Sequence, residues 1–139
     1  MSRRELRERI FKLLFRIEFN KPEDMEEQKE LFFLDEENYA EGADADYIRE
    51  KYDNIMEKLS EIDEMINEKA ECWTTARMGK VELTILRLAV YEIQFDDTIP
   101  TSVAINEAVE LSKKFGQDSS SSFINGVLSQ FAQKQEGNV

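Results

Sequence analysis

The segment from residue 80 to residue 95 constrains the fold more than any other part of the chain. Its apolar residues fall on nearly every side of a helix and not on a single stripe. A helix of this kind must be surrounded by other elements, because its whole circumference avoids water. It is also shorter than the roughly 20 residues that cross a bilayer. The segment therefore predicts a central, buried helix, with the apolar residues Val81, Leu83, Ile85, Leu86, Leu88, Ala89, Val90 and Ile93.

The rest of the chain predicts the helices that surround this one. Apolar residues recur with a helical period, whereas no segment shows the alternation of a strand. Pro22 suits the first turn of a helix, and Gly116 suits the end of another. Thr101 or Ser102 is expected to cap the helix that Gly116 ends. The helices are expected at residues 3–19, 22–34, 46–71 with a break between 61 and 64, 80–95, 101–115 and 120–134, with an acidic loop at 35–45.

These patterns predict the fold class all-α, with about seven helices in two packed helical bundles. We expect a single domain, residues 1–139, made of an N-terminal half (residues 1–71) and a C-terminal half (residues 72–139), with Trp73 as a packing anchor at the join. The pair Asn125-Gly126 in the last helix predicts close packing against a neighbouring helix.

The composition argues against an enzyme. The chain has no histidine, which is the usual general base, and its one cysteine, Cys72, has no imidazole partner. The acidic residues between 35 and 46 lack the spacing of a calcium loop, so we expect no metal and no cofactor. No apolar run is long enough to span a membrane, and Lys12, Arg16 and Glu18 interrupt any signal-peptide core. We therefore expect a cytoplasmic protein.

The charge is spread unevenly. Residues 1–21 carry a net charge of +4 within a chain of net charge −12, and residues 22–72 carry −14. The apolar face of residues 3–17 centres on Ile10 and Ile17. The residues on a neighbouring stripe are Arg4, Arg7, Glu8, Phe11 and Phe15. Arginine binds phosphates, and an adjacent aromatic ring stacks on unpaired bases. The same pattern also fits phenylalanines that pack under another helix, with arginines that are merely solvated.

The C-terminal half carries a more specific signal. The segments Trp73–Arg77, Val81-Glu82, Leu86–Glu92, Ile99-Pro100, Val103–Leu111, Lys114–Gly116 and Phe123–Leu128 follow one another at characteristic spacings. In this order and spacing the chain resembles the NusB transcription antitermination factors. The N-terminal half is similar more loosely, through Arg3, Arg4, Arg7, Glu8 and Leu14-Phe15. Within the resemblance we interpret Arg87, Tyr91 and Glu92 as a paired structural network.

The resemblance implies binding of boxA-type single-stranded RNA together with NusE, a small-subunit ribosomal protein. The complex would act with RNA polymerase in antitermination, mainly on ribosomal RNA. The expected RNA-binding residues are Arg3, Arg4, Arg7, Phe15, Ser119 and Ser122, and the expected partner-binding residues are Phe15 and Glu82.

The chain also departs from the family pattern. Phe15 stands where relatives usually have tyrosine, Glu5 where they often have arginine, and Ser119 and Ser122 where many have aspartate and lysine. An acidic protein–protein adaptor that has lost RNA contact is therefore an alternative. A third is a relative of the NusB-like domain of RNA cytosine methyltransferases, against which the absence of a methyltransferase segment argues. Whether the protein forms a homodimer is left open.

Overall fold

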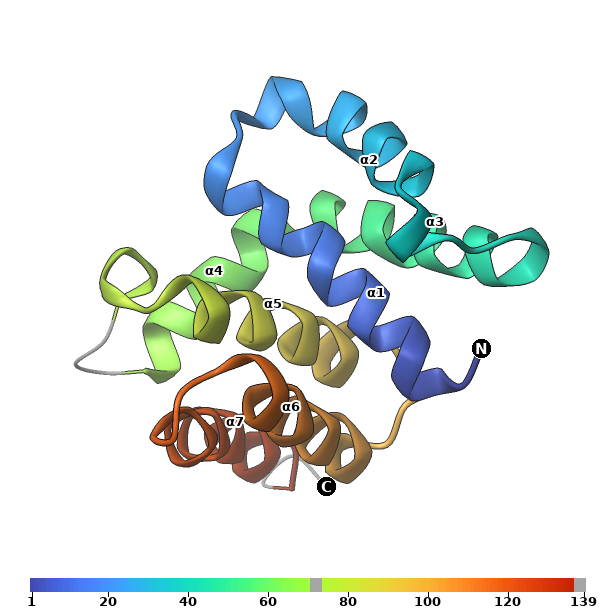
Figure 1. Ribbon diagram of the computed structural model, residues 1–139. Coiled ribbons are helices and arrows are strands. Elements are labelled where there is room, and N and C mark those ends of the chain that lie inside the picture. Colours follow the sequence, from blue (N-terminus) through green and yellow to red (C-terminus); the bar gives the residue numbers. More distant parts are fainter. Residues whose placement is uncertain (71–73, 137–139) are drawn as a thin grey trace. The chain divides into compact units, whose positions relative to one another are not determined.

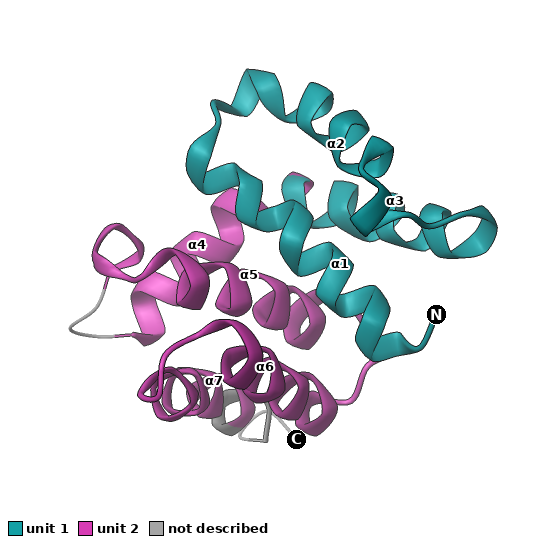
Figure 2. Ribbon diagram, viewed as in Figure 1, with its two compact units in different colours: residues 1–56 teal, residues 57–139 magenta. Residues whose placement is uncertain are grey.

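The computed structural model describes residues 1–70 and 74–136, so Cys72 and Trp73 lie outside the described residues. The chain forms two compact units, residues 1–56 and residues 57–139 (Figure 2). Seven α-helices and no strand occur within the described ranges, which confirms the all-α fold class (Figure 1). The grouping of residues 1–71 and 72–139 as two halves stays a prediction.

The first unit consists of three α-helices joined by short 3₁₀ turns. Helix α1 spans Arg3–Phe15, α2 spans Met25–Leu34, and α3 spans Gly42–Glu57. Pro22, expected in the first turn of a helix, instead begins the 3₁₀ turn that precedes α2. Gly42, which falls in the expected loop, instead begins α3 with a φ of +57°, a left-handed conformation that glycine adopts without strain.

The second unit consists of four α-helices built around α5. Helix α4 spans Leu59–Lys69, α5 Lys80–Phe95, α6 Thr101–Phe115 and α7 Ser120–Glu136. Helix α5 packs against α4, α6 and α7, which explains why its residues from Leu83 to Ile93 are all buried. The prediction of a central helix is thus confirmed.

Some local predictions were wrong. The long helical stretch breaks at Lys58 and not between residues 61 and 64. Pro100 occupies the position before α6, and neither Thr101 nor Ser102 caps it with a side chain. Gly126 is exposed, and a Cβ atom placed there would meet nothing within 4 Å, so it does not mark close helix packing. Gly116 does end α6, as predicted. A Cβ atom there would come within 2.7 Å of the Ser120 hydroxyl and 2.8 Å of the Ser112 carbonyl oxygen, so the position has no room for a side chain.

The network interpretation of Arg87 is confirmed. Its Nε and Nη2 atoms each donate to one carboxylate oxygen of Asp63, both at 2.9 Å, so α5 and α4 are joined by a bidentate pair. Arg87, Tyr91 and Glu92 are all buried. Within the described ranges, no helix is both long and apolar enough to cross a membrane.

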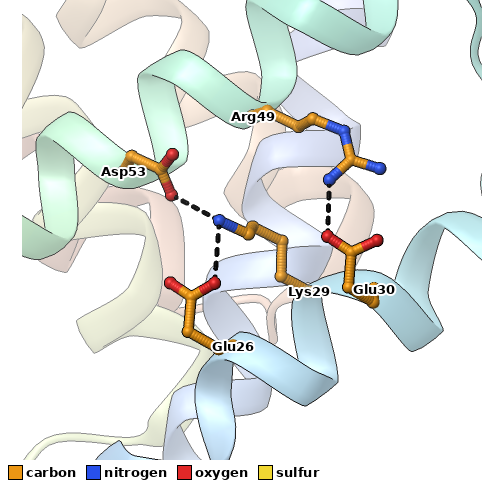
Figure 3. Close-up of polar contacts among 5 residues, drawn as sticks. All are labelled: Glu26, Lys29, Glu30, Arg49 and Asp53. Carbon is orange, nitrogen blue, oxygen red and sulfur yellow. Dashed lines mark hydrogen bonds and ion pairs between the residues drawn. The ribbon is translucent and has the colours of Figure 1, made fainter.

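Ion pairs join α2 to α3 (Figure 3). The Lys29 ammonium lies 3.0 Å from Asp53 on α3 and 3.2 Å from Glu26 on its own helix. One turn away, Arg49 on α3 lies 2.9 Å from Glu30 on α2. Burial lowers the pKa of Lys29, but the two carboxylates outweigh it, so that the pKa of Lys29 is raised overall.

Tyr52 lies under this cluster, and its hydroxyl is buried without a hydrogen-bond partner within the described residues. Burial, followed by the nearby carboxylates of Glu26 and Asp53, raises the pKa of Tyr52 to about 12. We expect Tyr52→Phe to increase the free energy of unfolding by about 1 kcal/mol at pH 7, because it removes a desolvated hydroxyl and keeps the ring. Urea unfolding of both proteins measures this difference.

The difference in the free energy of unfolding between wild type and Tyr52→Phe should increase at alkaline pH. The pKa of Tyr52 is raised on folding, so its contribution to stability is complete below pH 10 and is lost as the pH rises to about 12. The wild type should therefore lose roughly 2 kcal/mol more than Tyr52→Phe across this window. Tyr47→Phe, at an exposed position of the same helix, serves as the control. A constant difference between wild type and Tyr52→Phe from pH 9 to pH 12 would contradict the assigned burial.

Candidate RNA interface

The first turn of α1 is fixed by local contacts. The Ser2 hydroxyl accepts a hydrogen bond from the Glu5 backbone N–H at 3.1 Å, which is the usual way for serine to cap a helix. The N-terminal ammonium lies 3.1 Å from Asp44 at the start of α3. These contacts hold the beginning of α1 in place, so the side chains that follow Ser2 project from a defined turn.

Three arginines were predicted to contact RNA, and the structure places them differently. Arg3 and Arg4 are exposed in the first turn, whereas Arg7 is 7 % exposed. Arg4 and Arg7 both interact with other protein groups, and Arg3 makes no such interaction among the described residues. Arg3 and Arg4 are thus the exposed arginines at the helix N-terminus, where their charge opposes the helix dipole.

The other basic residues of this region divide into two classes. Arg9 donates to the Tyr39 carbonyl at 3.0 Å, and Arg16 donates to the Gln28 side-chain oxygen at 3.2 Å and lies over the Phe32 ring. These two arginines therefore bind within the first unit. Lys12 and Lys21 are exposed, as are Arg3 and Arg4. Residues 1–21 thus expose fewer basic side chains than the seven that the sequence contains.

An aromatic row extends along α1 into the turn that follows it. The rings of Phe11 and Phe15 are nearly parallel, with centroids 5.9 Å apart, and the rings of Phe15 and Phe19 meet edge to face at 5.1 Å. Phe11 is buried, Phe15 is half-buried and Phe19 is 60 % exposed. The row therefore begins in the core and ends in solvent. Sequence reasoning missed Phe19, although the spacing 11, 15, 19 was the signal that could have found it.

Glu82 lies in the second unit, in the first turn of α5. Its carboxylate accepts a hydrogen bond of 2.6 Å from the Ser120 hydroxyl at the start of α7. The Ser120 oxygen in turn accepts from the Gln117 backbone N–H at 2.9 Å. Gly79 has no side chain, which leaves room for the carboxylate to fold back toward the start of α5. Glu82 is half-buried and links the N-termini of α5 and α7 through this hydrogen bond.

Ser119 and Ser122 are exposed, but they line different hollows. Ser119 shares a pocket of about 230 Å³ with Glu82, together with Met78, Gly79, Ser120 and Phe123. Ser122 lines a groove of about 580 Å³ between α6 and α7, whose polar lining consists of serine and asparagine side chains and contains no carboxylate. The structure therefore brings Glu82 and Ser119 together and sets Ser122 apart from them.

The comparisons with known proteins agree with one another. The family model described as the NusB family matches residues 4–133. The chain belongs to the NusB family. A transcription antitermination protein NusB from Agathobacter rectalis is 52% identical over 95% of this chain and 100% of its own length.

Solved structures support the same assignment. A T. maritima NusB structure has a TM-score of 0.85 at 35% identity and covers 100% of this chain and 99% of that chain. A crystal structure of antitermination factors NusB and NusE in complex with dsRNA has a TM-score of 0.82 at 26% identity, with 95% and 96% of the two chains covered. The NusB family is non-enzymatic, which confirms the prediction that the chain is not an enzyme.

Proposed function

We propose that this NusB family member binds RNA together with NusE, as an antitermination factor, in the cytoplasm. The observation that carries the proposal is the exposed pair Arg3 and Arg4 at the start of α1, on a chain whose net charge is −12. The relative that was solved with NusE and dsRNA supports both partners. The finer proposal is that the RNA is a boxA-type single strand and that the complex acts with RNA polymerase on ribosomal RNA.

In this proposal each predicted site residue contacts RNA or NusE. Arg3 and Arg4 neutralise phosphates, and Arg7 contributes through the small part of its side chain that is accessible. Phe15 supports a base or NusE, and the hydroxyl groups of Ser119 and Ser122 donate hydrogen bonds to the RNA. Glu82 contacts NusE through the carboxylate oxygen that Ser120 leaves available. The acidic remainder of the chain repels RNA, so NusE has to supply much of the binding surface.

Titration of a labelled boxA-type RNA, with and without NusE, at two salt concentrations tests the proposal. We expect weak binding by the protein alone, at least tenfold tighter binding with NusE, and a loss of affinity as salt rises. A scrambled RNA of the same length is the control. If the RNA does not bind even at low salt while NusE still binds after nuclease treatment, the adaptor that has lost RNA contact is the correct function.

The aromatic row gives a separate prediction. We expect Phe19→Ala to weaken RNA binding about tenfold, because a base that stacks on an aromatic ring gains roughly 1–3 kcal/mol. The free energy of unfolding should change little, since the side chain is 60 % exposed. Phe33→Ala, at a half-buried ring of α2, is the control. An RNA affinity that is equal in wild type and Phe19→Ala would remove Phe19 from the interface.

A further inference from the structure

The outer face of α2 carries leucine and glutamate side by side. At 100° per residue, Leu34 lies opposite the buried residues Met25 and Phe32, and Leu31 lies about 60° from Leu34 on the same side of the helix. Leu34 is 78 % exposed and Leu31 is 45 % exposed. Glu27 lies one turn before Leu31, and Glu30 one turn before Leu34. The four side chains Glu27, Glu30, Leu31 and Leu34 form one face, which we call the α2 face.

The surroundings of the α2 face are acidic. Residues 22–56 hold 13 acidic and 3 basic side chains. Every one of these acidic side chains except Asp44 is exposed. Lys29 and Lys51 are 8 % and 5 % exposed, and Arg49 is half-buried and paired with Glu30. Lys29 and Arg49 offset Glu26, Asp53 and Glu30, but acidic side chains still outnumber basic ones by 13 to 3 in this segment.

Exposed apolar side chains gather in the same unit. Seven large apolar residues are exposed among the described residues. Six of them belong to residues 1–56, and only Val103 belongs to the second unit. Single exposed leucines are common on protein surfaces, whereas exposed apolar groups that form a contiguous patch mark interaction sites. The first unit thus combines an acidic surface with accessible apolar groups: Met1, Phe19, Leu31, Leu34, Tyr39 and Tyr47.

We propose that the α2 face docks a basic, leucine-containing segment of a partner protein. Lysine or arginine side chains of the segment would meet the carboxylates, and its apolar side chains would cover Leu31 and Leu34. RNA fits poorly, because the exposed charge around this face is mainly negative and the nearby cation Arg49 is already paired with Glu30. A second copy does not fit well either, since each copy carries a net charge of −12. This surface is separate from α1, to which the RNA contact is assigned.

The test uses the full chain and two labelled helical peptides of equal positive charge. One has leucines at i, i+3 and i+4 spacing among lysines, and the other has alanines in their place. We expect the leucine peptide to bind roughly tenfold more tightly, because two partly exposed leucines become covered. Leu31→Gln with Leu34→Gln should remove this advantage, and Glu27→Lys should weaken both peptides. Val103→Gln, which changes an exposed apolar residue of α6, should change nothing.

Several outcomes would overturn the proposal. These are equal affinities for the two peptides, no binding of either, an unchanged affinity in Leu31→Gln with Leu34→Gln, or the same loss in Val103→Gln. Sedimentation that shows self-association of the wild type, and its loss in Leu31→Gln with Leu34→Gln, would assign the surface to a second copy instead. RNA titrations with Leu31→Gln and Leu34→Gln, which keep the net charge, should match the wild type, so failure of this proposal is distinguishable from failure of the RNA assignment.

Discussion

Reversal of both exposed arginines, Arg3→Glu with Arg4→Glu, is expected to weaken RNA binding about 100-fold at low salt. Each substitution removes a phosphate contact and places a carboxylate where the phosphate would lie, so repulsion adds to the lost attraction. The dependence on salt should also become shallower. For a single strand, the loss of two phosphate contacts lowers the slope of log K against log salt concentration by about 1.4. Fluorescence anisotropy with a labelled RNA, over a salt series, measures both quantities.

The control for this prediction is a charge reversal of equal size in α6. Lys113 and Lys114 are exposed near the end of α6, so Lys113→Glu with Lys114→Glu changes the net charge by the same amount. A similar loss of RNA affinity in both double variants would mean that total charge, and not α1, decides binding. Unfolding curves for both variants check that the fold is kept. Arg7→Ala should destabilise the fold more than either, since Arg7 is buried and engaged.

The fold was largely predictable because the apolar pattern is strong. The boundaries predicted for the fifth and sixth helices, 80–95 and 101–115, are those of α5 and α6. Helix α5 is enclosed by three neighbours in its own unit, and its sequence shows this directly as apolar residues on every side. The break between α3 and α4 was misplaced because no glycine or proline lies near Lys58. Its position is therefore set by packing and not by local preference.

The candidate site was harder to predict. On a helical wheel Arg7 falls between Leu14 and Phe11, both of which are buried, so its neighbours already indicated partial burial. A long side chain at the edge of a core can turn inward or outward, and periodicity does not distinguish the two. The serines 119–122 give no local sign that Ser120 is the one that binds Glu82. That choice depends on where α7 begins relative to α5, which is a property of the tertiary structure.

The acidity of the chain bears on both proposals. Residues 22–56 cannot attract RNA, yet their exposed leucines and carboxylates suit a basic protein. Residues 1–21 have the opposite charge and carry the accessible arginines. The first unit therefore presents two surfaces with different electrostatic preferences. Under these proposals the protein would gain RNA affinity from a basic partner without being a strong RNA binder by itself.

The largest loss of stability is expected when Asp63 is removed. Asp63→Leu leaves the Arg87 guanidinium, whose side chain is 9% exposed, without its bidentate partner. A buried charge that loses its partner costs roughly 3 kcal/mol, which lowers the Tm by about 10 °C for a domain of this size. Arg87→Met should cost less, because Asp63 is 26% exposed and water can reach its carboxylate. Urea and thermal unfolding measure these losses.

The double variant Asp63→Leu with Arg87→Met separates the pair from the packing. Two apolar side chains in place of a partly buried ion pair should recover most of the stability that Asp63→Leu loses, because no charge is then left unpaired. Lys113→Met is the control, since the Lys113–Glu110 pair is on the surface and its loss should cost less than about 1 kcal/mol. If the double variant is as unstable as Asp63→Leu, the cost arises from altered packing between α4 and α5. Recovery would show that desolvation of Arg87 makes Asp63 necessary.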